Sequence, residues 1–536
     1  FDSSFHHIAV VFDPATSTIT FYYDGVAKSA SVVGGASVTA VSEFTSTTMK
    51  TTGTLDEVVL HPAMFTATMA AQRAGLMASS AYSHPATFVL SPIPWVDRTS
   101  GNEGSNPVPK LVENALTITD GVYFENRLIF SGGERIMASA SGDAYNFYLR
   151  DVEQIADDDP IDTGLSSKRV TTIDRLVAVS SSILIFTRSA QQSELQADSG
   201  LSSTSIKIRP TTQYPSIQAS SPITSGLLVY FVAANGDAMA LYEQLYSDQS
   251  LTFVAEDVSS HVASLLPSSI RTLTAHPQSG RVFVLPTTGT TLEVYRSTQR
   301  GNTKVQSAWS QWTFDATYRF CDIAVLANNL YMLVESPTSS GQFVLEKVPL
   351  GYQAASGSYP HVVYLDRKVS LSGGTFAAGN TTWTIGVTDA TINRIVKTDG
   401  TIITVTSSGT TVTATGSDQS AGSFTGGRTY TMSVELTRPF VRTGPNGDAL
   451  LWAWLQHAEQ AWDIRNTRTM TFTATATNTG TQTKIFTSTT ATPTTDQFIT
   501  NFNGQCGTTT IAISDSGPGP ATLTAGQYRL QAETRN

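Results

Sequence analysis

Residues 121–148 have the sequence GVYFENRLIFSGGERIMASASGDAYNFY. Two strand-like runs, at 122–130 and 135–139, stand on either side of a Gly-Gly pair. Short apolar runs bounded by turn residues are typical of antiparallel strands joined in hairpins. Ser-Gly-Asp at 141–143 predicts another turn, and the aromatic run at 145–149 predicts a further strand that fills a core. The stretch therefore indicates antiparallel β-structure.

The same pattern continues from this stretch to about residue 348. Strand-like runs recur across turns that contain Gly, Asn or Asp, such as those at 234–237 and 278–280. Strand pairs at this spacing, with no helices between them, are typical of a propeller made of antiparallel blades. We therefore predict a β-propeller-like core at 121–368. No blade motif repeats regularly enough to predict the number of blades.

The segments at 5–25, FHHIAVVFDPATSTITFYYDG, and 55–76, LDEVVLHPAMFTATMAAQRAGL, have another character. They resemble the C-terminal half of a laminin-G-like, concanavalin-type jelly roll, and this resemblance covers residues 1–85. Half a jelly roll leaves unpaired strand edges. We therefore expect the remaining strands upstream or on another chain, since the sequence also opens on Phe1 instead of Met.

Three further regions complete the expected organisation. Residues 86–120 form a Pro-rich connector, because prolines at 92, 94, 107 and 109 disfavour both helix and central strand. Residues 369–435 are rich in Thr and Ser and predict an inserted β-sandwich. Residues 436–536 predict a helix-containing β region, since DALLWAWLQHAEQAWDI at 448–464 has apolar residues along one helical face. With a short helix at 66–77, the fold class is mainly β: propeller-like antiparallel sheets plus jelly-roll-like and small β-sandwich modules, with one or two helices.

Composition excludes several classes of protein. The 536 residues include 33 Lys plus Arg and 43 Asp plus Glu, a net charge of −10, and 40% are hydrophobic, so the chain is no disordered polyanion. The acidic balance argues against a protein that grips nucleic acid through its phosphates. Cys321 and Cys506 are too few for a disulfide framework or a zinc site. The apolar runs are shorter than the roughly 18 residues of a membrane span.

No catalytic, cofactor-binding or metal-binding residue is predicted, and we expect no enzyme activity. The sequence lacks a phosphate-binding GxxxxGK[ST] loop, an HExxH motif, a GxSxG elbow and an EF-hand pattern. His6 and His7 would point to opposite faces of a strand, so they cannot chelate one metal together. The acidic residues Asp157, Asp158, Asp159 and Asp162 could collect a hard cation, but a solvated turn or an intersubunit contact is the favoured interpretation.

Ordered motifs connect residues 93–440 with a known family. WVDRTSGNEGSNPVP at 95–109 is followed by the stretch at 121–148 and then by DDDPIDTGLSSKRVTTIDRLVAVSSSILIFTRSAQQSEL at 157–195. In this order they resemble the nozzle proteins of short-tailed bacteriophages, also called tail tubular protein B. The family's GVSQQP-like opening is absent, and GNE replaces its usual GD. The motif residues are Trp95, Arg98, Asn126, Arg127, Gly142 and Asp143, to which we assign structural roles: the Asn126 amide and the Arg127 fork are expected to tie neighbouring backbone.

The resemblance implies a structural subunit of the virion tail. Six copies would form a ring that continues the DNA ejection channel below the portal and adaptor and helps dock tail fibres. The implied partners are five further copies, the tail adaptor protein, tail fibres, and genomic DNA that passes without sequence-specific binding, with host surface glycans as a further candidate. Asp157, Asp158, Asp159 and Asp162 are the expected interface residues. The alternative is a carbohydrate-binding or glycan-hydrolysing β-protein, suggested by the jelly-roll half.

Overall fold

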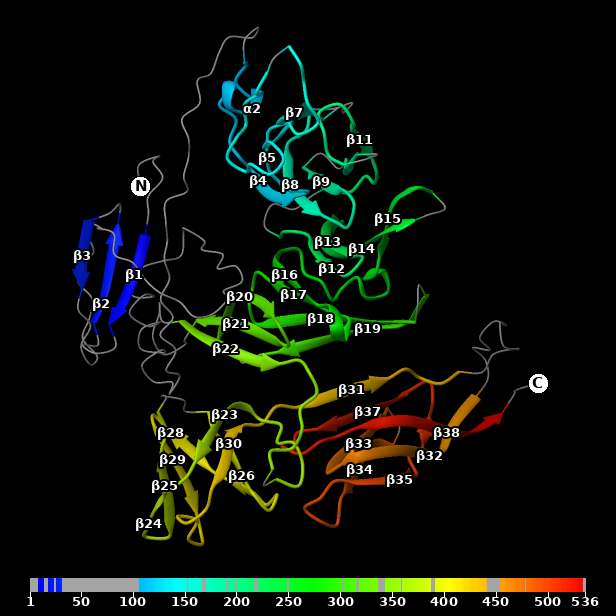
Figure 1. Ribbon diagram of the computed structural model, residues 1–536. Helices are drawn as coiled ribbons and strands as arrows, with labels where there is room; N and C mark the ends of the chain where they lie inside the picture. Colours follow the sequence, from blue (N-terminus) through cyan, green and yellow to red (C-terminus); the bar gives the residue numbers. More distant parts are fainter. Residues whose placement is uncertain are drawn as a thin grey trace. The chain divides into compact units, whose positions relative to one another are not determined.

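The computed structural model divides into two compact units, residues 1–351 and 352–536, which are considered separately (Figure 1). The structure describes residues 8–13, 18–23, 26–30, 106–151, 153–165, 170–188, 191–197, 200–215, 220–247, 250–300, 303–314, 318–335, 343–357, 359–386, 391–440, 454–477 and 479–533.

The segment from residue 120 to 349 of unit 1 forms five antiparallel sheets, each made of strands that are consecutive in sequence (Figure 1). The first sheet contains β4 (Asp120–Phe124), β5 (Arg127–Gly132), β6 (Arg135–Ala138) and β7 (Ile161–Gly164). The second contains β8 (Ile173–Ala178), β9 (Ile183–Thr187), β10 (Ser193–Ala197) and β11 (Ile206–Pro210). The third contains β12 (Ile223–Ser225), β13 (Leu228–Asn235), β14 (Ala238–Ser247) and β15 (Thr252–Asp257).

The fourth and fifth sheets follow the same meander. The fourth contains β16 (Ile270–His276), β17 (Arg281–Pro286), β18 (Thr291–Arg300) and β19 (Thr303–Thr313). The fifth contains β20 (Arg319–Leu326), β21 (Asn329–Glu335) and β22 (Phe343–Pro349). Short 3-10 turns, η1 (Ser260–Val262) and η2 (Pro277–Ser279), lie before and within the fourth sheet.

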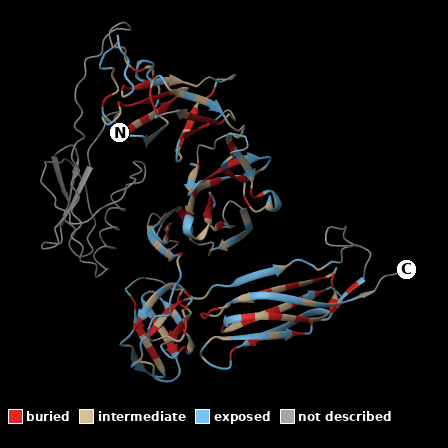
Figure 2. Cartoon of the chain, turned by 45° about the vertical axis from the view of Figure 1, so that its right-hand side comes forward, coloured by how far each residue is buried: buried red, intermediate tan, exposed pale blue. Residues whose placement is uncertain are grey.

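Each of these sheets packs against the next through its own apolar cluster. The cluster between the first and second sheets includes Ile129 and Ile173, and the next one includes Phe186 and Phe231. Tyr230 and Val284 belong to the cluster between the third and fourth sheets, and a further cluster joins the fourth sheet to the fifth. Figure 2 shows buried residues along these sheets. Strands buried on both faces explain continuous apolar runs such as that in β13.

Two sequence expectations in the first sheet are wrong. The run at 122–130 is not one strand, because β4 ends at Phe124 and β5 begins at Arg127. Glu125 (φ +45°) and Asn126 (φ +59°) form the turn between them, and positive φ at both positions is the geometry of a two-residue hairpin turn. Residues 145–149 do not form a strand either. Phe147 packs on Phe130, with ring centroids 5.8 Å apart, whereas Tyr145 is 39% exposed.

Unit 2 contains two pairs of sheets. In the first pair, one sheet has β23 (Asp366–Leu371), β30 (Phe424–Arg428), β26 (Arg394–Lys397) and β27 (Ile402–Thr404). Its companion has β24 (Thr375–Ala377), β25 (Asn380–Thr384), β29 (Thr411–Thr415) and β28 (Thr406–Ser408). Trp383, Ile395 and Phe424 lie in the core between them. Threonines alternate with these apolar residues along β25 and β29, as expected for strands with one buried face.

The second pair forms the C-terminal sandwich. One sheet has β31 (Met432–Leu436), β37 (Thr509–Asp515), β33 (Thr469–Ala476) and β34 (Gly480–Thr487). The other has β35 (Thr494–Thr500), β32 (Trp454–Thr467), β36 (Gly504–Gln505) and β38 (Leu523–Glu533). Trp462 is 1% exposed and stacks on Phe472, with ring centroids 5.0 Å apart.

The helix predicted at 448–464 is wrong for residues 454–464, which belong to strand β32. Leu455, His457, Trp462 and Ile464 are buried at a mainly two-residue spacing, and register shifts at 457/459 and 463/464 break the strict alternation. β32 pairs with β38 along its length and with β35 and β36 on its other side. Long-range pairing on both edges therefore overrides a local helical pattern. Residues 448–453 lie outside the described residues.

Few elements of the N-terminal region belong to the described part of the chain. β1 (Ile8–Asp13), β2 (Thr18–Tyr23) and β3 (Val26–Ala30) form an antiparallel sheet. The rest of the predicted jelly-roll half, His6, His7, the helix at 66–77, and residues Trp95 and Arg98 of the connector lie outside it. Within the described residues, the α-helix is α2 (Lys110–Glu113), and no helix is long and apolar enough to cross a membrane.

Candidate functional site

Most of the motif residues picked out from the sequence lie together in the first sheet. Arg127 opens β5 and Asn126 precedes it, while Gly142 and Asp143 lie in the long connection between β6 and β7. The four acidic residues lie on the same connection and on β7 itself, and we call residues 157–162 the acidic turn. The connection therefore returns to the start of β5, where Arg127 can reach it.

The guanidinium of Arg127 joins two segments of backbone, the end of β6 and the acidic turn. It is 1% exposed and donates one hydrogen bond each to the carbonyl oxygens of Ser139, Asp157 and Asp159, all at 2.7 Å. A planar guanidinium presents several N–H donors in a fixed fork, which suits acceptors arranged around it. Arg127 thereby fixes the acidic turn against the end of β6.

Two opposing influences act on the pKa of Arg127. Burial lowers it, whereas the charges of Asp158, Glu125 and Asp159 raise it, and the net direction is below the ordinary value. Arginine nevertheless stays charged in proteins at neutral pH. The neighbouring carboxylates therefore stabilise the buried positive charge of Arg127. This gives them a structural role within the chain.

Asn126 and Gly142 contribute through their backbones. Both have left-handed conformations, with φ of +59° and +77°, which asparagine and glycine tolerate better than other residues. The Gly142 N–H donates to the Asn126 carbonyl at 2.9 Å, so the described contact of Asn126 uses its main chain and not its amide. Asp143 accepts the Tyr145 N–H at 3.3 Å and stabilises the adjoining turn.

Each carboxylate of the acidic turn has a partner within the chain. Asp157 accepts a hydrogen bond from the Thr204 hydroxyl at 3.1 Å, and Asp158 forms an ion pair with Arg150 at 2.6 Å. Asp159 is 1% exposed and accepts the Ala156 N–H at 2.8 Å. Asp162 binds the Lys110 N–H and the Arg135 guanidinium, both at 2.7 Å. No group of three or more metal-ligating side chains occurs in the parts of the chain that are described.

A buried ionic group between the third and fourth sheets was not predicted. Glu243 of β14 is 7% exposed and accepts the Tyr230 hydroxyl at 2.9 Å and the Lys304 ammonium at 2.8 Å. Burial alone lowers the pKa of Lys304, but the hydrogen bond and charge of Glu243 outweigh it and raise that pKa. A charged residue inside the apolar run LYEQLY at 241–246 is the sequence signal that could have indicated this site.

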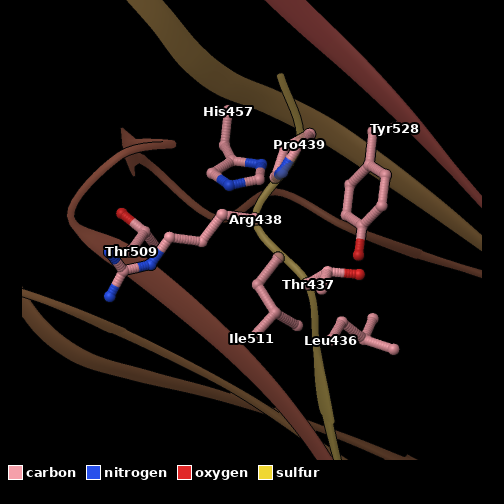
Figure 3. Close-up of a pocket in the computed structure, with 8 residues that line it drawn as sticks. All are labelled: Leu436, Thr437, Arg438, Pro439, His457, Thr509, Ile511 and Tyr528. Atoms are coloured by element: carbon pink, nitrogen blue, oxygen red, sulfur yellow. The ribbon is translucent and has the colours of Figure 1, made fainter. Parts of the chain in front are cut away.

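A small pocket in the C-terminal sandwich contains an unpartnered histidine (Figure 3). His457 is 1% exposed, and neither ring nitrogen has a hydrogen-bond partner among the residues that the structure describes. Figure 3 shows the imidazole next to Pro439 and Arg438, with Tyr528 on the other side of the pocket. Arg438 donates to the Gly507 carbonyl at 2.8 Å. No water-sized sphere fits inside, so we assign this pocket no ligand. Its lining residues are Leu436, Thr437, Arg438, Pro439, His457, Thr509, Ile511 and Tyr528.

The buried imidazole predicts a pH-dependent stability of the C-terminal sandwich. Burial lowers the pKa of His457 below its ordinary value, so the unfolded chain binds a proton at a higher pH than the folded chain does. The free energy of unfolding should therefore decline as the pH falls below about 6.5, by at most about 1.4 kcal/mol per pH unit from this residue.

Hydrogen exchange of β32 and β38 amides at about pH 7.5 and about pH 5, corrected for intrinsic exchange rates, measures this effect. His457→Gln should flatten the pH dependence, whereas His261→Gln, which changes an exposed histidine of η1, should leave it as in the parent chain. An identical pH dependence in His457→Gln and the parent chain would contradict the prediction.

Comparisons with known proteins agree on a tail protein family. The family model described as "Bacteriophage nozzle protein" matches residues 82–527. The tail tubular protein gp12 of Escherichia phage T7 is 26% identical over 289 residues, which cover 53% of this chain and 35% of that protein. The chain thus spans about a third of the length of this curated relative.

Solved structures give only weak likenesses. The β-propeller domain of Cps50 (Swd1) from Myceliophteria thermophila has a TM-score of 0.27 at 8% identity, covering 44% of this chain and 74% of that one. Hsv2 from Kluyvelomyces marxianus has a TM-score of 0.26 at 9% identity, covering 53% and 77%. Scores at this level carry no argument about fold or function.

Proposed function

Because the chain belongs to the bacteriophage nozzle protein family, we propose that six copies of it form a ring that continues the DNA ejection channel. It is a structural component of the virion tail. The ring would lie below the portal and adaptor, contact the adaptor protein and help dock tail fibres. DNA would pass through it without sequence-specific binding, and no catalysis is involved.

The observation that carries this proposal is the family match over residues 82–527. The described motif residues within that range contact other parts of the same chain and stabilise its first sheet. Arg127 donates its hydrogen bonds to main-chain carbonyls, and the carboxylates of the acidic turn bind partners in the same chain. Side chains committed to backbone support the rigidity that a channel wall needs. They are poorly suited to catalysis, which requires groups free to reach a substrate.

The proposed blades add to this view. The successive sheets from β4 to β22 have the connectivity of propeller blades, with each sheet packed on the next. We propose that they form the propeller-like core and that the sandwiches of unit 2 are further wall modules. The glycan-related alternative depends on residues 1–85, most of which lie outside the described part, and no described feature favours it.

Electron microscopy of the purified chain and of the assembled tail tests the proposal. We expect particles with six-fold symmetry, in which the acidic turn lies at or near a boundary between neighbouring copies. Rings of identical subunits require head-to-tail contacts that close. Another symmetry would refute the six-fold ring. A six-fold ring in which the acidic turn lies far from every neighbour would refute the interface assignment alone.

A further inference from the structure

Charge is distributed unevenly along unit 1. Residues 106–165, which contain the first sheet, have four basic and eleven acidic residues, a net charge of −7. Residues 270–350, which contain the fourth and fifth sheets, have seven basic and five acidic residues, a net charge of +2. The first sheet and the last two sheets of this segment thus differ in formal charge, and complementary charge on two regions of a subunit can orient one copy on another.

The negative side has carboxylates without a cation. Asp151, Glu153 and Asp157 are exposed and form no ion pair with another described residue. Asp151 accepts the Glu153 N–H at 2.9 Å. Ile155 between them is 54% exposed. We call these four residues the acidic edge: an exposed apolar residue flanked by carboxylates that form no ion pair within the described part of the chain.

The positive side is a pair of arginines on adjacent strands. Arg281 of β17 stands directly opposite Arg296 of β18, and side chains at opposed positions share one face of a sheet. Arg281 donates to the Leu350 carbonyl at 3.3 Å, and the described residues supply neither arginine with a carboxylate. Burial and then the charge of Arg296 lower the pKa of Arg281. Like charges directly opposite each other are destabilising. An anion that binds both guanidinium groups would therefore reduce their mutual repulsion.

Leu326 adds an exposed apolar residue on the hairpin that is linked to Arg281 through Leu350. Leu326 ends β20 and is 61% exposed. The hairpin that it opens is joined to the Arg281 contact, because the Leu350 N–H donates to the Asn328 carbonyl at 2.7 Å. The positive side thus combines two guanidinium groups with an exposed leucine, whereas the acidic edge combines three carboxylates with an exposed isoleucine.

We propose that the acidic edge of one copy docks onto the Arg281–Arg296 pair of the next copy. One chain is not expected to join its own two sides, since the second and third sheets are packed between the first and the fourth. Guanidinium groups bind carboxylates in a bidentate, directional manner. The contact uses two different surfaces and is therefore head-to-tail, as a ring requires. The inference rests on the proposed ring and names its pairing surfaces.

A second copy fits this chemistry better than nucleic acid does. Proteins that bind DNA through its charge contact several phosphates with a row of basic residues, and about six to ten such contacts is a typical number. Two arginines on a chain with a net charge of −10 do not form such a row. Nucleic acid binding is therefore the competing outcome of the test.

Charge reversal in the full chain tests the pairing. One variant has Arg296→Glu, a second has Asp151→Lys with Glu153→Lys, and a third combines all three changes. Sedimentation velocity over a concentration series, in about 0.15 M salt, measures self-association. We expect each of the first two variants to associate at least about tenfold more weakly than the parent chain, and the third to regain most of that loss. The controls Lys484→Glu and Asp237→Lys change exposed charges elsewhere and should have no such effect.

A covalent trap provides a second measurement. The chain with Glu153→Cys and Arg296→Cys should form disulfide-linked multimers under mild oxidation if the two sites meet between copies, because a disulfide needs Cα atoms within about 7 Å. The native Cys321 and Cys506 are buried, which keeps the background low. Thermal unfolding of every variant separates loss of the contact from loss of the fold.

The outcomes separate this inference from the ring itself. Parent chains that assemble while the reversals and the cysteine pair have no effect would overturn the pairing and leave the ring standing. Reversals that weaken association without recovery in the combined variant would also overturn it. Parent chains that remain monomeric at every concentration would refute both. Loss of binding to a DNA duplex in Arg296→Glu, with unchanged association, would assign the arginine pair to nucleic acid instead.

Discussion

Replacing Arg127 with methionine is expected to lower the free energy of unfolding of the first sheet by about 3–5 kcal/mol. The change leaves the buried carbonyls of Ser139 and Asp159, and the part-buried carbonyl of Asp157, without their donor. It also removes the buried cation that the neighbouring carboxylates compensate. Each unsatisfied carbonyl costs roughly 1–3 kcal/mol, and partial relaxation of the acidic turn keeps the total below their sum.

Hydrogen exchange of the β5 and β6 amides measures this effect locally, without assuming that the whole chain unfolds in one step. Arg127→Lys should be milder, because an ammonium can still serve some of the three acceptors, though without the fork. Arg209→Met is the control, since that arginine is exposed and should change stability by less than about 0.5 kcal/mol. An Arg127→Met chain with parental protection in β5 would contradict the role assigned to Arg127.

Glu243→Leu is expected to have an effect of similar size, again about 3–5 kcal/mol, at the boundary between the third and fourth sheets. The Lys304 ammonium, whose side chain is 25% exposed, would lose its close anion, and the buried Tyr230 hydroxyl would lose its acceptor. Lys304 also lies 3.6 Å from Glu256, but that carboxylate is 76% exposed and can replace little of the buried interaction.

The matched variant is Glu243→Leu with Lys304→Met. Replacing both charges by apolar residues of similar size removes the unpaired ammonium, so much of the lost stability should return. Hydrogen exchange of the β13 and β14 amides in Glu243→Leu, in Lys304→Met and in the double variant completes a double-mutant cycle. A cycle with no coupling energy, or a Glu243→Leu chain as stable as the parent, would show that the pair adds nothing to the contact between these sheets.

Much of the fold can be predicted from local sequence because its elements are short and regular. Turn residues separate apolar runs along most of residues 121–350, and the five consecutive meander sheets follow those breaks. The exceptions are informative. Residues 122–130 were predicted as one strand although the polar residues Glu125, Asn126 and Arg127 interrupt its apolar residues. Asparagine tolerates the positive φ found there, so this polar triplet is the signal that could have placed the turn. Residues 454–464 look helical because their apolar spacing fits 3.6 as well as 2 once two bulges are present.

The candidate site was also predictable only in part: its residues could be selected from the sequence, but their contacts could not. Order and type of the motif residues were sufficient to connect the chain with the nozzle family and to select Arg127 and the acidic turn. Their hydrogen-bond partners could not be predicted, because the acceptors of Arg127 lie 12 to 32 residues away from it in the sequence. The Glu243–Lys304 pair, the unpartnered His457 and the opposed arginines 281 and 296 were not predicted at all.

The β class, the meander of short strands and the family follow from residue order alone, because turn chemistry and motif order are local properties of the chain. The burial and pairing of the charges do not follow from it. They require the folded structure, because the energy of a charge depends on its solvation and on its neighbours within a few ångströms. Those neighbours are brought together by sheet packing and not by position along the chain.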